Sequence, residues 1–305
     1  MTYSAQNVLS SRTALLGYGM AALAAIGFSA KAILVKLAYT EAVDAVTLLA
    51  LRMLLSVPFF LYIALRKTGP RSDTALERQD YLAILILGML GYYLSSLFDF
   101  IGLQYISAGL ERLILFLYPT MVVLLSALLL RRPVGRREVT ALVLSYAGIA
   151  VVFLNEIDLR GEGLLLGAAF VFASTLTYAA YLIGAGKAIA RIGPSRFTAY
   201  AMLVASAATL LQFMLTHPLS ALHLPLRVYE LSFAMALFST VFPVFMLSAS
   251  ISIIGSSHAS LVGTIGPVST LMLASMFLGE QMTVLQVTGA ALVLCGVLSI
   301  TLRRR

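Results

Sequence analysis

Residues 255–302, GSSHASLVGTIGPVSTLMLASMFLGEQMTVLQVTGAALVLCGVLSITL, contain two long apolar runs separated by the short polar segment GEQMT. Neither run has the polar face that a helix at the surface of a water-soluble protein needs. Each run has about the roughly 20 residues with which an α-helix crosses the hydrocarbon core of a bilayer. The stretch therefore predicts two consecutive membrane-spanning helices.

The rest of the chain has the same character. Of its 305 residues, 60% are hydrophobic and only 11% are charged, and the mean hydropathy is +0.97. A soluble globular protein has about a quarter charged residues. Lipid, unlike water, accepts helices that are apolar on every side. The composition predicts an all-α integral membrane protein with ten transmembrane helices, at 13–38, 45–65, 81–103, 107–129, 136–154, 163–186, 197–216, 229–251, 257–278 and 284–302.

Several other classes of function are disfavoured. The net charge of +8 could indicate a nucleic-acid partner, but that requires a basic face in water, whereas these Lys and Arg lie in short clusters between apolar runs. The single cysteine, Cys295, lies within the last run and offers neither a disulfide nor a metal site. The sequence contains no nucleotide-binding loop and no nucleophile triad. We therefore expect no metal, no cofactor, no direct use of ATP and no enzyme activity.

The distribution of Lys and Arg predicts the orientation. Fifteen of the 21 fall in alternate segments, which begin with the N-terminus and end with the C-terminus, and only Arg160 and Arg227 fall in the others. Because positive charges collect on the cytoplasmic side, both termini should be cytoplasmic. The expected location is the cytoplasmic (inner) membrane, with the polar segment 66–80 as a solvated cytoplasmic loop.

An internal repeat is visible at an offset of 148 residues. Residues 107–154 align with 255–302, and the alignment places Pro119 on Pro267 and Gly148 on Gly296. The basic loop RRPVGRR aligns with GEQM, which has no basic residue, so equivalent loops should lie on opposite sides of the membrane. We therefore predict two inverted five-helix repeats, 1–155 and 156–305. Many secondary transporters have this architecture, with the solute site between the halves near the middle of the membrane.

The last apolar segments also resemble a known family. Residues 277–300 resemble the end of a repeat in the EamA family of the drug/metabolite transporter (DMT) superfamily. The matching positions are Gly279, Glu280, Gln286, Gly289 and Gly296, together with Lys36, Arg52, Pro119 and Pro267. The first half departs from the pattern, because Arg131-Arg132-Pro133 replaces the Gly-Glu pair and Glu111-Arg112 stands where many members are apolar. The resemblance implies export of amino acids or other metabolites, with sugar-phosphate and nucleotide-sugar carriers as relatives.

Five charged residues lie inside the predicted spans, where each charge costs a few kcal/mol unless it has a partner or a wet cavity. They are Lys31, Arg52, Asp99, Glu111 and Arg112, and counting from the outer helix ends places all five at one depth. One interpretation pairs Asp99 with Arg112 and Glu111 with Arg52 to fix the fold. In the other, the surplus cation, for which Lys31 and Arg52 are the first candidates, binds a carboxylate or phosphate of the solute. A proton-coupled rearrangement of the same groups remains open.

Other candidates depend on single residues. Tyr178 and Tyr181 are three residues apart and can share a helix face that lines a cavity for a planar or amphiphilic solute; packing is the alternative. His258 could relay protons or be structural. Glu280 is expected at a solvated helix end. Pro119 and Pro267 should kink their helices and provide hinges at equivalent points of the two halves.

We therefore predict a secondary transporter that exports small metabolites such as amino acids by alternating access. Its partners would be the bilayer and a solute that could bear a carboxylate, with coupling to protons as a possibility. A sugar-phosphate or nucleotide-sugar carrier is an alternative within the same class. An intramembrane enzyme acting on lipid-linked substrates is the alternative from another class, and Asp99 with Glu111 would be its only candidate catalytic pair.

Overall fold

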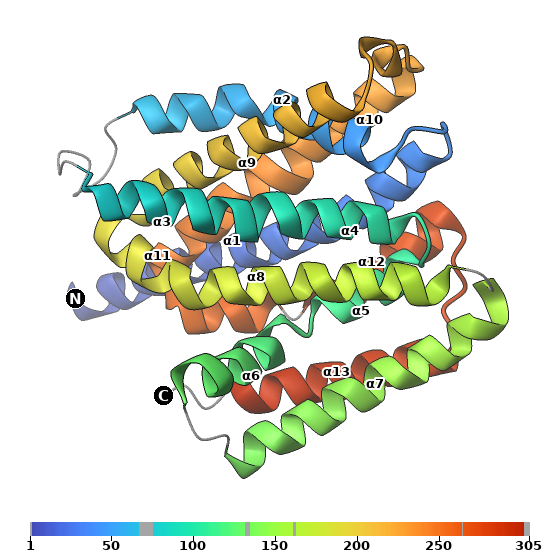
Figure 1. Ribbon diagram of the computed structural model, residues 1–305. Helices are drawn as coiled ribbons and strands as arrows, with labels where there is room; N and C mark the ends of the chain where they lie inside the picture. The colour runs from blue at the N-terminus through green and yellow to red at the C-terminus, as the bar shows by residue number, and fades with distance from the viewer. Residues whose placement is uncertain (1, 67–75, 132–134, 161–162, 264, 302–305) are drawn as a thin grey trace.

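The computed structural model describes residues 2–66, 76–131, 135–160, 163–263 and 265–301, and these contain helices and no strand. Most helices lie side by side along one direction, so that the bundle has two ends (Figure 1). The elements of the first half of the chain are α1 (Thr2–Tyr39), α2 (Ala45–Leu65), α3 (Arg78–Gly88), the π-helix η1 (Met89–Leu94), α4 (Ser95–Leu103), α5 (Ala108–Leu115), α6 (Tyr118–Leu130) and α7 (Arg136–Arg160).

The second half of the chain continues the bundle. Its elements are α8 (Leu164–Ile192), α9 (Pro194–Thr216), the 3-10 turn η2 (Leu219–Leu222), α10 (Leu226–Ala236), the π-helix η3 (Leu237–Val241), α11 (Phe242–Gly263), α12 (Ile265–Leu278) and α13 (Val284–Thr301).

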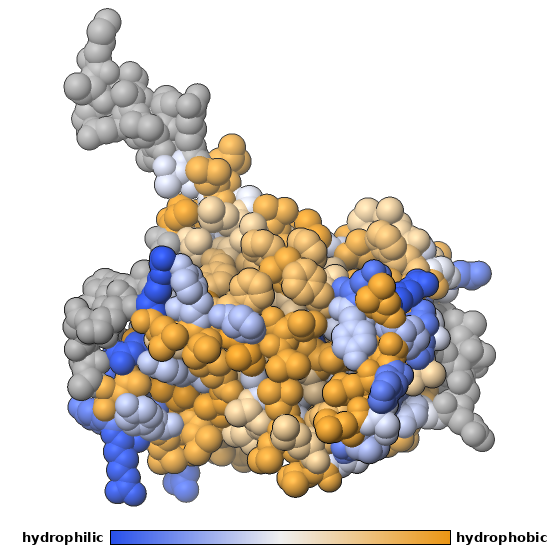
Figure 2. Space-filling model, turned by 90° about the horizontal axis from the view of Figure 1, so that it is seen from above, coloured by the Kyte–Doolittle hydropathy of each residue, from blue (hydrophilic) through white to orange (hydrophobic). Residues whose placement is uncertain are grey.

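The outer surface is apolar where lipid would surround it. Leu128, Leu165 and Leu215 are each more than 70% exposed, which water would penalise and lipid would not. Hydrophobic side chains cover the middle of the face in Figure 2, and hydrophilic ones gather toward the two ends of the bundle. Among the described residues, seven helical segments are long and apolar enough to cross a membrane, and three shorter apolar helices accompany them. The protein is thus a multi-pass membrane protein, and the total of ten spans stays a prediction.

The order of elements repeats at the offset found in the sequence. Residues 78, 89 and 136, where α3, η1 and α7 begin, have counterparts 148 residues later, where α10, η3 and α13 begin. Both halves have a π-helix at the equivalent place, although π-helices are rare. Arg131 and Gly279, again 148 residues apart, end α6 and α12 with positive φ angles of 52° and 65°. The repeat is therefore a property of the backbone as well as of the residues, while its inversion stays a prediction.

The predicted fourth span, 107–129, is not one helix. α5 ends at Leu115 and α6 begins at Tyr118, so that Pro119 opens a new helix instead of kinking a continuous one. Pro267 likewise lies at the start of α12. The Ile114 carbonyl at the break accepts a hydrogen bond of 3.2 Å from Thr175 Oγ1 of α8. The same carbonyl also accepts a bond of 3.0 Å from the Leu117 N–H, and Thr175 also bonds the Val171 carbonyl of its own helix at 2.9 Å. Thr175 is therefore a second donor, which ties the broken helix to α8.

The helix α11 extends across residues 252–256, where the sequence predicts the turn between the eighth and ninth spans. The contacts with α1 nevertheless show that the chain reverses its direction in this part. The start of α11 packs against Gly27 and Ile254 packs against Gly17, so the chain first runs antiparallel to α1. The Gly266 carbonyl then accepts a hydrogen bond of 2.9 Å from Ser29. Since Gly17 and Ser29 are about 18 Å apart along a helix, the chain turns back along α1 between Ile254 and Gly266.

The two halves of the chain contact each other at several places. At one end, Asp80 is buried and its Oδ1 accepts a bond of 2.5 Å from Arg191 Nε of α8. The prediction that Asp80 belongs to a solvated loop is thus wrong, because it lies in the first turn of α3. On another side, the backbones of α7 and α13 touch where Gly148 meets Gly289. A side chain at either glycine would separate these helices.

Candidate functional site

Three of the five intramembrane charges form one cluster. Lys31 Nζ of α1 is ion-paired with Asp99 Oδ2 of α4 and lies 3.2 Å from Glu111 Oε1 of α5. The side chain of Lys31 is 17% exposed, that of Asp99 is 3% exposed and that of Glu111 is fully buried. Lys31 is therefore the shared counter-ion of two buried carboxylates.

The turn between α4 and α5 brings the two carboxylates together. Asp99 lies about one turn before the end of α4, and Glu111 lies one turn into α5. Ser107 caps α5, because its Oγ accepts a bond of 3.0 Å from the Leu110 N–H. Two antiparallel helices joined by a tight, capped turn place these residues at one level, as the sequence predicted.

The predicted ion pairs are wrong in their partners. Asp99 was expected to pair with Arg112 and Glu111 with Arg52, whereas Lys31 takes both carboxylates. Arg52 of α2 instead donates a hydrogen bond of 3.0 Å to Ser96 Oγ, and its guanidinium lies 4.8 Å from the centre of the Phe100 ring. Because Arg52 is only 5% exposed, its charge depends on this hydroxyl and on the cation–π contact.

Arg112 has a different environment from the other two cations. Within the described parts of the chain it makes no ion pair, and its Nε has no hydrogen-bond partner. Its guanidinium lies against Gly266 of α12, at a place where a Cβ atom would meet it. α5 belongs to the first half of the chain and α12 to the second. Arg112 thus places a partly exposed cation at the contact between the halves.

A row of aromatic rings lies beside Arg112. Tyr118 of α6 packs edge-on against Tyr178, with 5.7 Å between the ring centroids, and Tyr178 stacks on Tyr181, with 5.5 Å between the centroids. Tyr181 in turn meets Tyr92 of η1, with a hydroxyl–hydroxyl distance of 3.0 Å. Arg112 is close enough to Tyr118 and Tyr178 to interact with them electrostatically. The prediction that Tyr178 and Tyr181 share a face is confirmed, and they pack against each other in doing so.

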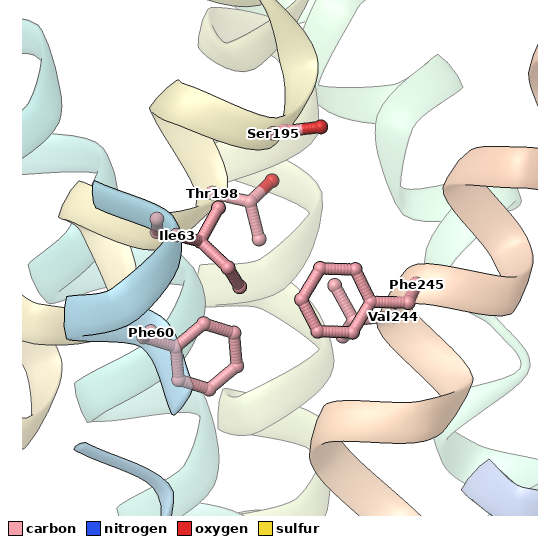
Figure 3. Close-up of a pocket in the computed structure, with 7 residues that line it drawn as sticks. Phe60, Ile63, Ser195, Thr198, Val244 and Phe245 are labelled. Atoms are coloured by element: carbon pink, nitrogen blue, oxygen red, sulfur yellow. The ribbon is translucent and has the colours of Figure 1, made fainter. Parts of the chain in front are cut away.

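Figure 3 shows a mostly apolar pocket elsewhere in the bundle. The residues that line it come from α2, α9 and α11, and they are Phe60, Ile63, Ser195, Thr198, Ala199, Val244 and Phe245. Phe197, which directly precedes Thr198 in α9, stacks on Tyr181 with 6.3 Å between the ring centroids, and this contact connects the pocket wall to the row of rings. The pocket is separate from the charged cluster, and Tyr178 and Tyr181 do not line it.

Glu280 has a role that the sequence did not predict. Instead of ending a helix in solvent, its carboxylate accepts the N–H groups of Ala108 and Gly109 at 3.1 and 3.4 Å. A carboxylate at a helix N-terminus also interacts favourably with the helix dipole. Glu280 of the second half thus holds the start of α5, the helix that carries Glu111 and Arg112.

Two further predicted residues are placed as follows. Lys36, which the family resemblance singled out, donates a hydrogen bond of 2.9 Å to the Leu103 carbonyl at the end of α4. His258 lies in α11, and its side chain is outside the described part of the structure. Its role as a proton relay therefore stays a prediction.

Comparison with known proteins agrees with this arrangement. The model of the EamA-like transporter family matches residues 15–154 and again residues 165–302. The uncharacterized transporter YcbK of Bacillus subtilis (strain 168) is 31% identical over 274 residues, covering 86% of this chain and 85% of its own. The uncharacterized transporter YyaM of the same organism is 25% identical over 230 residues, or 73% of each chain. A solved crystal structure with 18% identity has the same fold, with a TM-score of 0.61 over 96% of this chain and 97% of that one.

Proposed function

From the premise that this chain belongs to the EamA-like transporter family, we propose that it is a secondary transporter for a small solute that bears a carboxylate. In this proposal, the protein exports metabolites such as amino acids across the cytoplasmic membrane by alternating access.

The observation that carries the proposal is that the Arg112 guanidinium makes no ion pair within the described structure. Charged side chains in a membrane protein almost always have a polar partner, whereas the Nε of Arg112 has no hydrogen-bond partner among the described residues either. The carboxylate that acts on it most strongly, Glu111, is already ion-paired with Lys31. Its planar fork of donors matches the two oxygens of a carboxylate. Lys31, in contrast, is already occupied by Asp99 and Glu111. Arg112 therefore replaces Lys31 and Arg52 as the best candidate for the surplus cation that binds the solute.

The aromatic row supports a solute with an apolar or planar part. If the carboxylate is held by Arg112, the neighbouring rings of Tyr118 and Tyr178 can cover the rest of the molecule. The pocket at Phe60 and Phe245 continues the apolar surface beyond Tyr181 and Phe197. Sugar phosphates or nucleotide sugars would use the same guanidinium, but their polar rings would gain less from these neighbours.

The arrangement of the halves supports alternating access. The Asp80–Arg191 pair and the Glu280 contact with α5 join the halves, at opposite ends of the continuous helical segment α3–η1–α4. Breaking one contact while keeping the other would open the site to one side only. The interruption between Leu115 and Tyr118, directly before Pro119, is a place where short helices could tilt.

Topology is the first test of this scheme. We expect both termini to be cytoplasmic, as the distribution of Lys and Arg indicates. Cys295 is first replaced, and single cysteines are introduced near either end of the chain. In cells, these cysteines should react with a membrane-impermeant thiol reagent only after the membrane has been permeabilised. Reaction in intact cells would show that the labelled terminus lies outside, and the predicted orientation would then be wrong.

A solute screen on the purified protein tests the binding site. Amino acids, other carboxylates and sugar phosphates are each added, and thermal unfolding is followed. A true ligand at about 100 times its Kd should add about 2.7 kcal/mol of stability. The amide of the same compound, which lacks the carboxylate, should stabilise the protein less. In Arg112→Gln the ligand should give no stabilisation. Arg227→Gln, at a surface residue whose side chain is 60% exposed, is the control. A ligand-induced shift of the unfolding temperature that is as large in Arg112→Gln as in the wild type would refute Arg112 as the binding site.

A further inference from the structure

The cluster around Lys31 contains more acceptor capacity than it uses. Asp99 Oδ1, Glu111 Oε1 and Glu111 Oε2 are buried, and none has a hydrogen-bond partner. Lys31 satisfies one oxygen of Asp99 by a hydrogen bond and contributes only an ion pair of 3.2 Å to Glu111. Buried polar atoms usually have partners because an unmade hydrogen bond is costly. The unused oxygens of Glu111 therefore point to a partner that comes and goes.

The charge of the cluster indicates the same conclusion. With one cation and two carboxylates, its net charge is −1 when every group is ionised. The groups that face Glu111 are Lys31 from α1, Asp99 from α4 and Arg112 on its own helix, while Arg52 from α2 acts on Asp99. Neither arginine forms an ion pair with the carboxylates in the described structure. One added proton, or one added ammonium group, would neutralise the cluster.

Glu111 is better placed than Asp99 to accept that charge. Its side chain is fully buried, whereas Asp99 already holds the hydrogen bond from Lys31. It lies on α5, the short helix that ends at the break before α6 and whose start Glu280 holds from the other half. It also directly precedes Arg112, the proposed carboxylate site. A movement of α5 would therefore carry both the carboxylate of Glu111 and the guanidinium of Arg112.

We propose that Glu111 is a proton-binding site and that a proton and the ammonium group of the solute compete for it. This inference rests on the proposed function and specifies its energy source. When the site faces outward, Glu111 binds a proton and becomes a neutral carboxylic acid. When the site faces inward, the proton leaves to the cytoplasm and the amino acid binds, with its carboxylate on Arg112 and its ammonium on Glu111. One proton enters for each zwitterionic amino acid that leaves.

The proton site can be tested without knowledge of the solute. Infrared difference spectra of the purified wild type between acidic and alkaline pH should contain the C=O stretching band of a protonated carboxylic acid in an apolar environment. Glu111→Gln should lose this band while Lys31 keeps its ion pair with Asp99. Asp80→Asn, which removes another buried carboxylate, should retain it. A band that persists unchanged in Glu111→Gln, or is absent from the wild type, would overturn the proposal.

A conservative variant covers the case in which Glu111→Gln does not fold. Glu111→Asp keeps a carboxylic acid on a shorter side chain, so that its distance to Lys31 changes. The band should then move in frequency and titrate over a different pH range. An unchanged band would assign the signal to another residue and refute the role of Glu111.

Transport separates this proposal from the proposed function. In proteoliposomes, an opposing proton gradient should accelerate amino-acid exchange by the wild type and by Arg227→Gln, whereas the exchange that remains in Glu111→Gln should not respond to the gradient. A Glu111→Gln variant that is still accelerated by the gradient would refute the proton site and leave the transporter intact. If the wild type exchanges no amino acid, the proposed solute fails, and the infrared band alone then decides whether Glu111 binds a proton.

Discussion

Replacing Lys31 by methionine should destabilise the protein strongly, because Lys31 is the common partner of two buried carboxylates. At the 3.2 Å between Lys31 Nζ and Glu111 Oε1, and with an effective dielectric constant of about 20, the attraction is about 5 kcal/mol. The cost of bringing Lys31 out of water offsets part of this, and breaking a buried pair typically costs about 3–5 kcal/mol. We therefore expect Lys31→Met to lower the free energy of unfolding by about 3–5 kcal/mol.

The assay is a titration with denaturing detergent in mixed micelles, followed by circular dichroism, on a series of variants. Lys31→Met is compared with Glu111→Gln and with the double variant in a double-mutant cycle. The double variant should be more stable than Lys31→Met alone, since one orphaned carboxylate has been removed. Adding Asp99→Asn should restore most of the remaining loss. A Lys31→Met protein within about 1 kcal/mol of wild type, or a cycle with no coupling, would refute the assignment of Lys31 as the shared counter-ion.

Three further substitutions test the contacts around α5. Glu280→Ala should cost about 0.5–2 kcal/mol of stability, as measured by the same titration, because the N–H groups of Ala108 and Gly109 at the start of α5 lose their acceptor while Ser107 remains. Thr175→Val should cost about 0.5–1.5 kcal/mol because it removes the hydrogen bond from α8 to the Ile114 carbonyl, which keeps its bond from the Leu117 N–H; hydrogen exchange at the α5–α6 break would report the local opening. Gly266→Ala should leave the protein folded but displace the Arg112 guanidinium, so that carboxylate binding weakens in the thermal-shift assay.

Each of these variants has a control on the same chain. Glu230→Ala removes an exposed carboxylate, and Thr288→Val removes an exposed hydroxyl that bonds only within its own helix among the described contacts. Gly186→Ala adds a methyl group where no atom lies within 4 Å. All three controls should stay within about 0.5 kcal/mol of wild type. Controls as destabilised as the test variants would show that the effects are not specific to α5.

The sequence predicted the helical membrane fold and the 148-residue repeat because both depend on patterns that run along the chain. It also predicted that Lys31, Asp99 and Glu111 meet, since counting residues from helix ends gives depth. It did not give the partners, because these depend on how each helix is rotated about its axis. For this reason the sequence indicates Lys31 or Arg52 as the surplus cation and Arg112 as a partner of Asp99.

Other features escaped prediction because they are not written in local patterns. The break between α5 and α6 lies within an unbroken apolar run, and only Pro119, two residues after the break, could have indicated it. Its stabilisation by Thr175 involves a residue 61 positions away in the chain. Glu280 reads as a helix end from its neighbours, and its contact with Ala108 spans 172 positions. Such partners require the packed structure.

Counterflow of a labelled amino acid into proteoliposomes is the measurement that tests the central claim most directly. Vesicles loaded with the unlabelled compound should transiently accumulate the label through the wild-type protein and through Arg227→Gln. Arg112→Gln, folded as judged by size-exclusion chromatography, should not accumulate it. Counterflow that is undiminished in Arg112→Gln would contradict the claim that this guanidinium binds the solute between the two halves of the protein.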